Sequence, residues 1–175
     1  MPTASGARQG GAGVDTTGPV EVAGTGTIPA DAMTDVPVRF DVRCRYANGV
    51  EIQYKSGGTG IRFEGTDGWV QCDKWRGRIT ASSDDILRTK YTPEESKLWP
   101  CPPEEQRNFL DCIKSRKKTT YHAEAGHRLF TPLHLGHIAI RVGRTLKWDP
   151  EKEEIVGDAE AAKFLDRPAR DWEKA

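Results

Sequence analysis

The chain has 175 residues, with 26 basic and 26 acidic side chains and a pI of about 6.9. This balance argues against a general polyanion binder, which shows a basic excess, so nucleic acid is not predicted as a partner. No apolar run approaches the roughly 20 residues that span a bilayer, and the N-terminus lacks the regions of a signal peptide, so we predict a cytoplasmic protein without a membrane partner.

The first 18 residues differ in composition from the rest. Gly, Ala, Ser and Thr dominate this stretch, and almost nothing in it can be buried. We predict that residues 1–18 form a disordered or loosely attached arm, because they cannot offset the entropy of ordering. The same contrast leads us to expect that Met1 is not the true start. Residues 19–175 are predicted to form a single α+β domain, a length that allows a sizeable core.

Period-two alternation marks the β-rich part of this domain. Apolar residues between 38 and 46 alternate with Arg and Asp, Asn48-Gly49 predicts a hairpin turn, and residues 50–55 form the return strand. Further short strands are predicted at 19–24, 61–64, 69–72 and 76–81. We expect an open, mostly antiparallel sheet with one apolar face that needs a cover.

The predicted helices supply that cover. A short helical turn is predicted near 83–87, and a first firm helix begins near Pro103. Its buried side is predicted to comprise Phe109, Leu110, Cys112 and Ile113. We interpret the basic run 114–118 as helix capping plus a solvated surface, in preference to a phosphate site.

A second helix is predicted over about 123–142. Pro132 lies inside it and Gly143 is placed to end it. Short strands at 147–148 and 154–156 follow, and Asp158 caps a last helix through 159–165.

Histidines and arginines on the second helix are the candidate site residues. His127 and His134 are seven positions apart and share a helix face, while His134 and His137 are neighbours on the surface. Three interpretations stay open: a polar pocket, a metal site, or satisfied helix histidines. The metal site is the least favoured, because the HExxH pattern is absent. Arg128 and Arg141 fit either an anion site or ordinary ion pairs.

No motif of a complete catalytic machine is present. Gly24-Thr25-Gly26 and Gly58-Thr59-Gly60 lack the third glycine and the following helix of a dinucleotide site. The four cysteines form no CxxC pair and are predicted to be free thiols. We therefore predict no catalytic, cofactor-binding or metal residue.

Several runs together resemble the C-terminal domain of the Gfo/Idh/MocA oxidoreductases, in the bacterial subgroup. The resemblance covers roughly residues 14–175. In the helical part it rests on NFLDCIKSRKK (108–118), AEAGHR (123–128) and HLGHIAIRVGRTLKWDPEKEEIVGDAEA (134–161), and elsewhere on TGPVEVAGTG (17–26), YANGV (46–50), GIRFEGTDGWV (60–70) and FLDRPARDW (164–172).

The resemblance implies a part of a two-domain enzyme. Family members bind NAD(P) in an N-terminal Rossmann domain, whereas the C-terminal α+β domain shapes the substrate pocket and makes oligomer contacts. Substrates are mostly sugars and cyclitols. By this resemblance His127, Arg128 and His134 border the substrate side of the long helix.

The sequence departs from the family in what it lacks. There is no Rossmann domain, no Lys-Pro pair of the family's catalytic motif, and no His before His122. We therefore expect no cofactor to be bound by this chain alone. The first hypothesis is that the chain is the substrate-binding and oligomerisation domain of an NAD(P)-dependent oxidoreductase. In this hypothesis it has a Rossmann-domain partner and does not catalyse the reaction by itself.

The alternative is a stand-alone, non-catalytic binding or assembly module of the same fold. For either hypothesis a homo-oligomer contact is predicted through the charged sheet face. That face carries Arg39, Asp41, Arg43, Arg45, Glu51 and Lys55. A His-rich metal protein is a remote third hypothesis.

Overall fold

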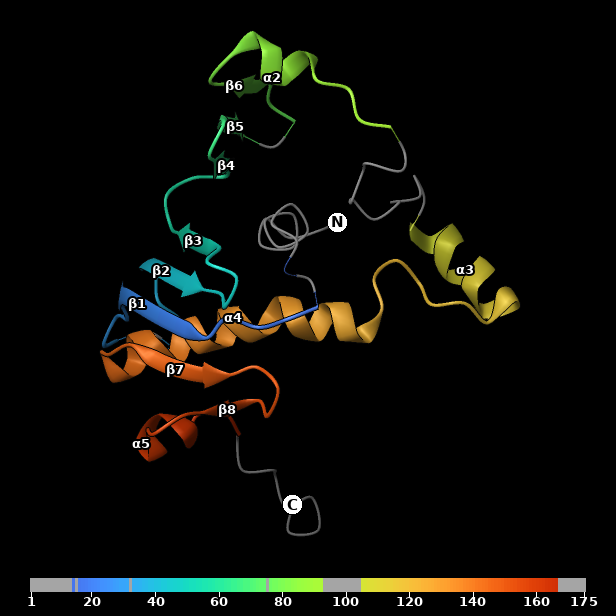
Figure 1. Ribbon diagram of the computed structural model, residues 1–175. Coiled ribbons are helices and arrows are strands. Elements are labelled where there is room, and N and C mark those ends of the chain that lie inside the picture. Colours follow the sequence, from blue (N-terminus) through green and yellow to red (C-terminus); the bar gives the residue numbers. More distant parts are fainter. Residues whose placement is uncertain (1–13, 15, 32, 75, 93–104, 167–175) are drawn as a thin grey trace. The chain divides into compact units, whose positions relative to one another are not determined.

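The computed structural model describes residues 14, 16–31, 33–74, 76–92 and 105–166. The chain divides into two compact units. Figure 1 labels the helices and strands of both. The first comprises residues 1–16 and 57–130, and the second residues 17–56 and 131–175. Most of the predicted arm, residues 1–13 and 15, lies outside the described residues, and the prediction of one domain over 19–175 remains a prediction.

An open antiparallel sheet forms the second unit. Its strand order is β3-β2-β1-β7-β8. β1 pairs with β2 from Glu21 opposite Arg45 to Thr27 opposite Arg39. The strands are β1 (Glu21–Thr27), β2 (Arg39–Arg45), β3 (Glu51–Lys55), β7 (Leu146–Asp149) and β8 (Glu154–Ile155). The predicted fold class, an antiparallel sheet with helices on one face, is confirmed.

Alternation along β2 and β3 separates the two faces of this sheet, as the sequence predicts. Val42 and Cys44 are buried, whereas Arg43 and Arg45 between and beside them are exposed. Ile52 of β3 lies opposite Cys44 and is buried too. The apolar side chains face the core because period-two geometry sends neighbouring side chains to opposite faces.

The second half of α4 (Ala123–Val142) lies along the sheet of the second unit (Figure 1). Glycines allow a close approach: a Cβ on Gly24 of β1 would lie 3.0 Å from the carbonyl oxygen of Gly136 in the helix. The hydroxyl of Tyr54 on β3 donates a 2.6 Å hydrogen bond to the carbonyl oxygen of Pro132. The sheet therefore contacts the backbone of α4 directly, in addition to the packing of buried side chains.

The ends of the later elements follow the predicted signals. Gly143 has a φ of +69°, the left-handed conformation that commonly ends helices, directly after α4. The Asp158 side chain accepts a 3.0 Å hydrogen bond from the Ala161 amide and caps α5 (Ala159–Ala162). The last helix is thus shorter than predicted.

The first unit holds a separate three-stranded antiparallel sheet of order β4-β5-β6. Its elements are β4 (Ile61–Gly65), β5 (Gly68–Cys72), β6 (Ile79–Ala81), α2 (Asp84–Arg88), α3 (Glu105–Ser115) and the start of α4. The strands were predicted, but as a continuation of the same meander as β2 and β3. Pro103, the predicted helix start, lies outside the described residues.

The core is unevenly divided between the units. Among the described residues, every buried hydrophobic residue except Val14 belongs to the second unit. The predicted buried side of α3 is wrong for Phe109, Leu110 and Ile113, which are exposed, whereas Cys112 is half-buried. The helix has the expected amphipathic spacing, but no described residue of the first unit buries these three side chains. Within the described residues no helix is both long and apolar enough to cross a membrane.

Candidate functional site

His127 and Arg128 lie on the part of α4 that belongs to the first unit. His127 is exposed. Arg128 is only 20% exposed, and its Nε donates a 2.8 Å hydrogen bond to Glu124 one turn earlier. This hydrogen bond from Arg128 holds the pKa of Glu124 below its usual value. Arg128 is therefore already engaged by a carboxylate, and an anionic or hydroxylated ligand would have to share this guanidinium with Glu124.

His134, the third predicted site residue, lies on the part of α4 in the second unit, next to the buried Leu135. Its side chain is exposed. A neutral imidazole offers one donor and one acceptor, which suits a ligand rich in hydroxyl groups. The three residues thus lie on one helix, and their predicted role in binding substrate stays a prediction.

Asp35, which the sequence did not mark as a site residue, joins the loop between β1 and β2 to α4 in the second unit. Asp35 accepts a 2.6 Å ion-pair contact from Arg141, and its backbone oxygen lies 2.8 Å from His137 Nε2. The Arg141 guanidinium also lies 4.6 Å from the ring centroid of Phe164. Because Asp35 is more than 100 positions from both partners, no local signal reveals the contact. These contacts hold the loop between β1 and β2 against α4. They also give His137 and Arg141, two of the candidate residues, partners within the protein.

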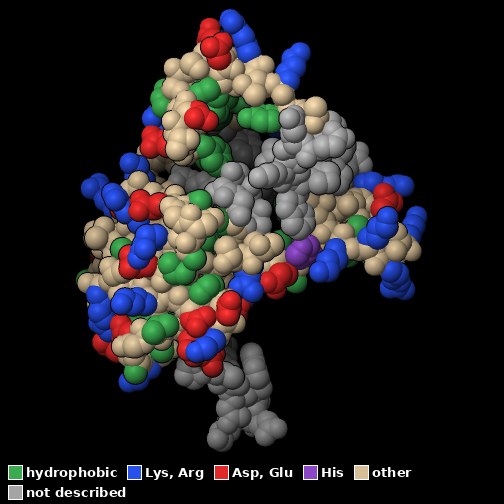
Figure 2. All heavy atoms as spheres, in the orientation of Figure 1, with side chains coloured by type: hydrophobic (Ala, Val, Ile, Leu, Met, Phe, Trp, Pro, Cys, Tyr) green, Lys and Arg blue, Asp and Glu red, His purple; other side chains and the backbone are tan. Residues whose placement is uncertain are grey.

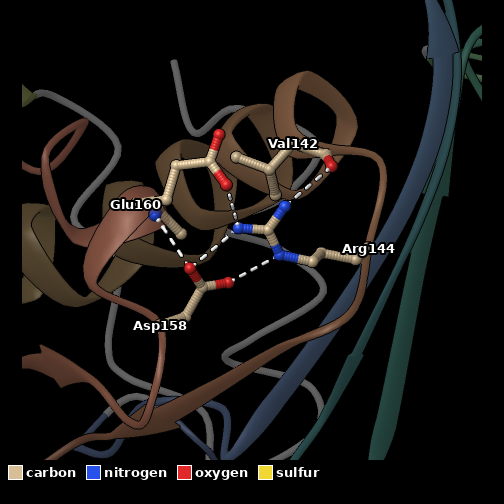
Figure 3. Close-up of polar contacts among 5 residues, drawn as sticks. Val142, Arg144, Asp158 and Glu160 are labelled. Atoms are coloured by element: carbon tan, nitrogen blue, oxygen red, sulfur yellow. Dashed lines mark hydrogen bonds and ion pairs between the residues drawn. The ribbon is translucent and has the colours of Figure 1, made fainter.

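An ion cluster around Arg144 joins the end of α4 to α5, as Figure 3 shows. Arg144 donates two 2.8 Å hydrogen bonds to Asp158 and one of 2.7 Å to Glu160. It also donates one to the carbonyl oxygen of Val142. All of these partners belong to the end of α4 or to the start of α5, so we infer that Arg144 stabilises the fold.

The Arg144 cluster predicts a pH dependence of stability. Hydrogen bonds from Arg144, and next from the Ala161 amide, lower the pKa of Asp158 from 3.8 to about 2. A carboxyl group with a lowered folded-state pKa stabilises the fold above its unfolded pKa, and this contribution is lost as the pH falls toward 2. Unfolding of wild type by urea should therefore take up more protons than unfolding of Asp158→Asn, and the difference should be largest, at about 0.8 proton, near pH 3 and close to zero at pH 5. If the free energy of unfolding changes with pH at the same slope in wild type and in Asp158→Asn, the lowered pKa of Asp158 is wrong.

The buried polar groups of the second unit do not form a nucleophilic site. Burial raises the pKa of the Cys44 thiol to about 12, so the unreactive thiol form prevails at neutral pH. Burial also raises the pKa of Tyr54, whose hydroxyl is bonded to Pro132. Cys72 and Cys112 of the first unit donate to backbone carbonyl oxygens. All three described cysteines are free, as predicted, and Cys101 lies outside the described residues.

The glycine motifs do not fit a dinucleotide phosphate site. Gly24 and Gly26 lie inside β1, where they make room for α4. Gly58 and Gly60 precede β4. Neither segment opens a helix, which a pyrophosphate site of this kind requires. Among the described residues no three His, Cys, Asp or Glu side chains are grouped closely enough to hold a metal ion.

Comparisons with known proteins agree with the fold. A family model described as the C-terminal alpha/beta domain of an oxidoreductase family, Gfo/Idh/MocA, matches residues 12–174. A search of curated proteins finds no match.

Two solved structures are similar in fold. The aldose-aldose oxidoreductase from Caulobacter crescentus, complexed with glycerol, has a TM-score of 0.55 and 16% identity over 82% of this chain. An NAD-binding protein from Listeria innocua has a TM-score of 0.56 and 13% identity over 75% of this chain. This chain spans only 44% and 42% of those two chains. At such identities the likeness shows the fold alone.

Proposed function

The chain belongs to the Gfo/Idh/MocA oxidoreductase family, over its C-terminal domain, and from this we propose that it supplies the substrate-binding and oligomerisation part of an NAD(P)-dependent oxidoreductase acting on sugars or cyclitols. The observation that carries the proposal is the family match over residues 12–174. The names of the two similar structures, one an aldose-aldose oxidoreductase and one an NAD-binding protein, support the substrate class and the cofactor.

The nicotinamide, in this proposal, is held by a Rossmann-domain partner. Hydride transfer requires the cofactor to be held against the substrate, and the glycine segments of this chain do not fit a phosphate site. What this chain contributes is the sugar side. His127, Arg128 and His134 are its proposed contacts, because imidazole and guanidinium groups match sugar hydroxyls as donors and acceptors.

A second copy of the chain is the proposed partner for the outer face of the second unit's sheet. Glu21 and Arg45 pair across β1 and β2 at 3.0 Å. Arg39 and Arg43 on the same face have no ion pair among the residues that the structure describes. Mixed charges of this kind set the register of a contact between copies, although each exposed pair adds little stability. The cytoplasmic location remains a prediction.

Cofactor titration tests whether the nicotinamide cofactor is bound by a Rossmann-domain partner and not by this chain. NADH and NADPH added to the purified chain, followed by nicotinamide fluorescence, should show no saturable binding up to about 1 mM, the upper end of common KM values. Tight binding of either cofactor would refute a half-enzyme that depends on a separate Rossmann domain.

Sugar titration tests the substrate side. Aldoses and inositols added to the isotope-labelled chain should shift the NMR signals of residues in α4. Replacing His134 with alanine should weaken this binding about 3–10-fold, the usual effect of losing one hydrogen bond. Glu151→Ala, on the exposed turn after β7, is the matched control and should leave the affinity unchanged. Binding that is absent, or shifts confined to other elements, would contradict the proposed site and favour a stand-alone assembly module.

A further inference from the structure

The sheet of the first unit has one polar face that carries a tryptophan. Neighbouring side chains along a strand point to opposite faces, and the register places Arg62 opposite Gln71 and Glu64 opposite Trp69. Thr80 of β6 lies opposite Gln71. We call these five side chains the platform. The other face of the same sheet is apolar and carries Ile61, Phe63, Val70 and Cys72.

The platform holds Arg62 in one position. Its Nε donates a 2.6 Å hydrogen bond to Glu64, and its Nη1 donates one of 3.0 Å to Oε1 of Gln71. Its guanidinium carbon lies 4.3 Å from the ring centroid of Trp69. All of these contacts are made within one sheet of one unit. A side chain that is already ordered loses less entropy when it binds a ligand, so Arg62 is pre-organised for binding.

Several polar atoms of the platform remain open. Arg62 is 44% and Glu64 69% exposed, and Trp69 and Gln71 are half-buried. Among the described residues, Nη2 of Arg62, Oε2 of Glu64 and the amide nitrogen of Gln71 have no hydrogen-bond partner. Figure 2 shows charged and hydrophobic side chains interspersed where Figure 1 places β4, β5 and β6. Donors and acceptors therefore lie together around a partly exposed indole.

Stability does not explain the platform. An exposed Arg–Glu pair contributes little to the free energy of folding, because water and salt screen it. A cation–π contact at an exposed site also contributes only modestly, and part of the Trp69 indole stays in water. The polar side chains of the platform should therefore be replaceable without unfolding the protein.

We propose that the platform binds the ring of a neutral polyol, such as a monosaccharide or a cyclitol. The charges of Arg62 and Glu64 cancel, so the platform has no net attraction for phosphate or another anion. Each hydroxyl group both donates and accepts, and two adjacent hydroxyls match a guanidinium that lies beside a carboxylate. The electron-rich face of the Trp69 indole attracts the C–H groups of such a ring. This inference does not rest on the proposed function, whose sugar contacts lie on α4.

Titration of Trp69 by NMR tests the proposal. The chain has five tryptophans, so the purified full chain is isotope-labelled at its indole nitrogens, and Trp69→Phe identifies the signal of Trp69. Glucose and myo-inositol, each added up to about 10 mM, should shift this signal saturably, since such concentrations reach weak specific binding. Arg62→Ala should weaken the binding about tenfold, and Glu64→Gln, which keeps the shape of the side chain, several-fold.

Arg88→Ala is the matched control for Arg62→Ala. It removes an exposed arginine of the same unit that also pairs with a carboxylate, Asp84 at 3.6 Å, but lies on α2 and off the platform. Its affinity for both rings should equal that of wild type. An equal loss of affinity in Arg62→Ala and Arg88→Ala refutes the platform as the binding site.

The same titration separates this inference from the proposed function. A Trp69 signal that does not shift saturably with either ring refutes the platform, and tighter binding of inorganic phosphate than of the neutral rings refutes its ligand class. The backbone signals of α4 report the proposed sugar contacts. If they respond and the Trp69 signal does not, the proposed function stands and the platform fails. If the Trp69 signal alone responds, the platform stands and the α4 contacts fail.

Discussion

Replacing Leu135 with alanine is expected to lower the free energy of unfolding by about 2–5 kcal/mol. Leu135 lies on α4 within the second unit, which holds nearly all of the described core, and its side chain is only 1% exposed. The substitution removes buried methyl groups and leaves a cavity that the sheet cannot fill without moving. Urea unfolding followed by circular dichroism measures the change.

Phe109→Ala is the matched control for Leu135→Ala, because it removes a larger side chain from an exposed position. With 57% of Phe109 exposed, the free energy of unfolding should change by less than about 0.5 kcal/mol. Equal losses for the two variants would show that α3 is packed into the core.

Local signals in the sequence were sufficient for most of the secondary structure. The alternation around Val42 and Cys44 predicts β2 because burial on one face and charge on the other leave a strand as the only consistent geometry. The bounds of α4 were predicted at 123–142 because Gly143 ends the helix through its positive φ. Such signals lie within a few residues of the feature that they predict.

Tertiary contacts were less predictable, since the residues involved are far apart in the sequence. Amphipathic spacing predicted a buried side for α3, but spacing shows which residues share a face and not whether another element covers it. The exposed Phe109 is the result. Likewise, nothing near β4 indicates that its sheet is separate from that of β3, because both have the same alternation and short turns.

The candidate site shows the same limit. The sequence identifies the residue types on α4 that suit a polar ligand, His127 and His134 among them. It does not show that Asp35 contacts His137 and Arg141, because that contact depends on how a loop folds back onto the helix. Nor does it show that Arg128 shares its guanidinium with Glu124. A sequence therefore predicts which residue types a site contains more readily than which side chains contact one another.

Gly136→Ala is expected to destabilise the second unit by about 1–3 kcal/mol, although alanine favours helix by about 1 kcal/mol over glycine. A Cβ at this position would collide with the Tyr54 hydroxyl and lie 2.8 Å from Val42 Cγ1. Helix and sheet would have to separate, which weakens the 2.6 Å hydrogen bond from Tyr54 to the Pro132 carbonyl. Gly126→Ala on the same helix is the control. Nothing lies within 4 Å of its added Cβ, so it should be neutral or stabilising by up to about 1 kcal/mol.

A double-mutant cycle with Tyr54→Phe separates this collision from a general intolerance of alanine. Tyr54→Phe alone should cost about 0.5–1.5 kcal/mol through the lost hydrogen bond. It also removes the oxygen that the new methyl group would meet. Gly136→Ala should therefore cost less in the Tyr54→Phe protein than in wild type, with a coupling of about 0.5–3 kcal/mol. Additive losses would show that the helix yields elsewhere, and that Gly24 or Val42, and not the tyrosine hydroxyl, sets the distance between α4 and the sheet.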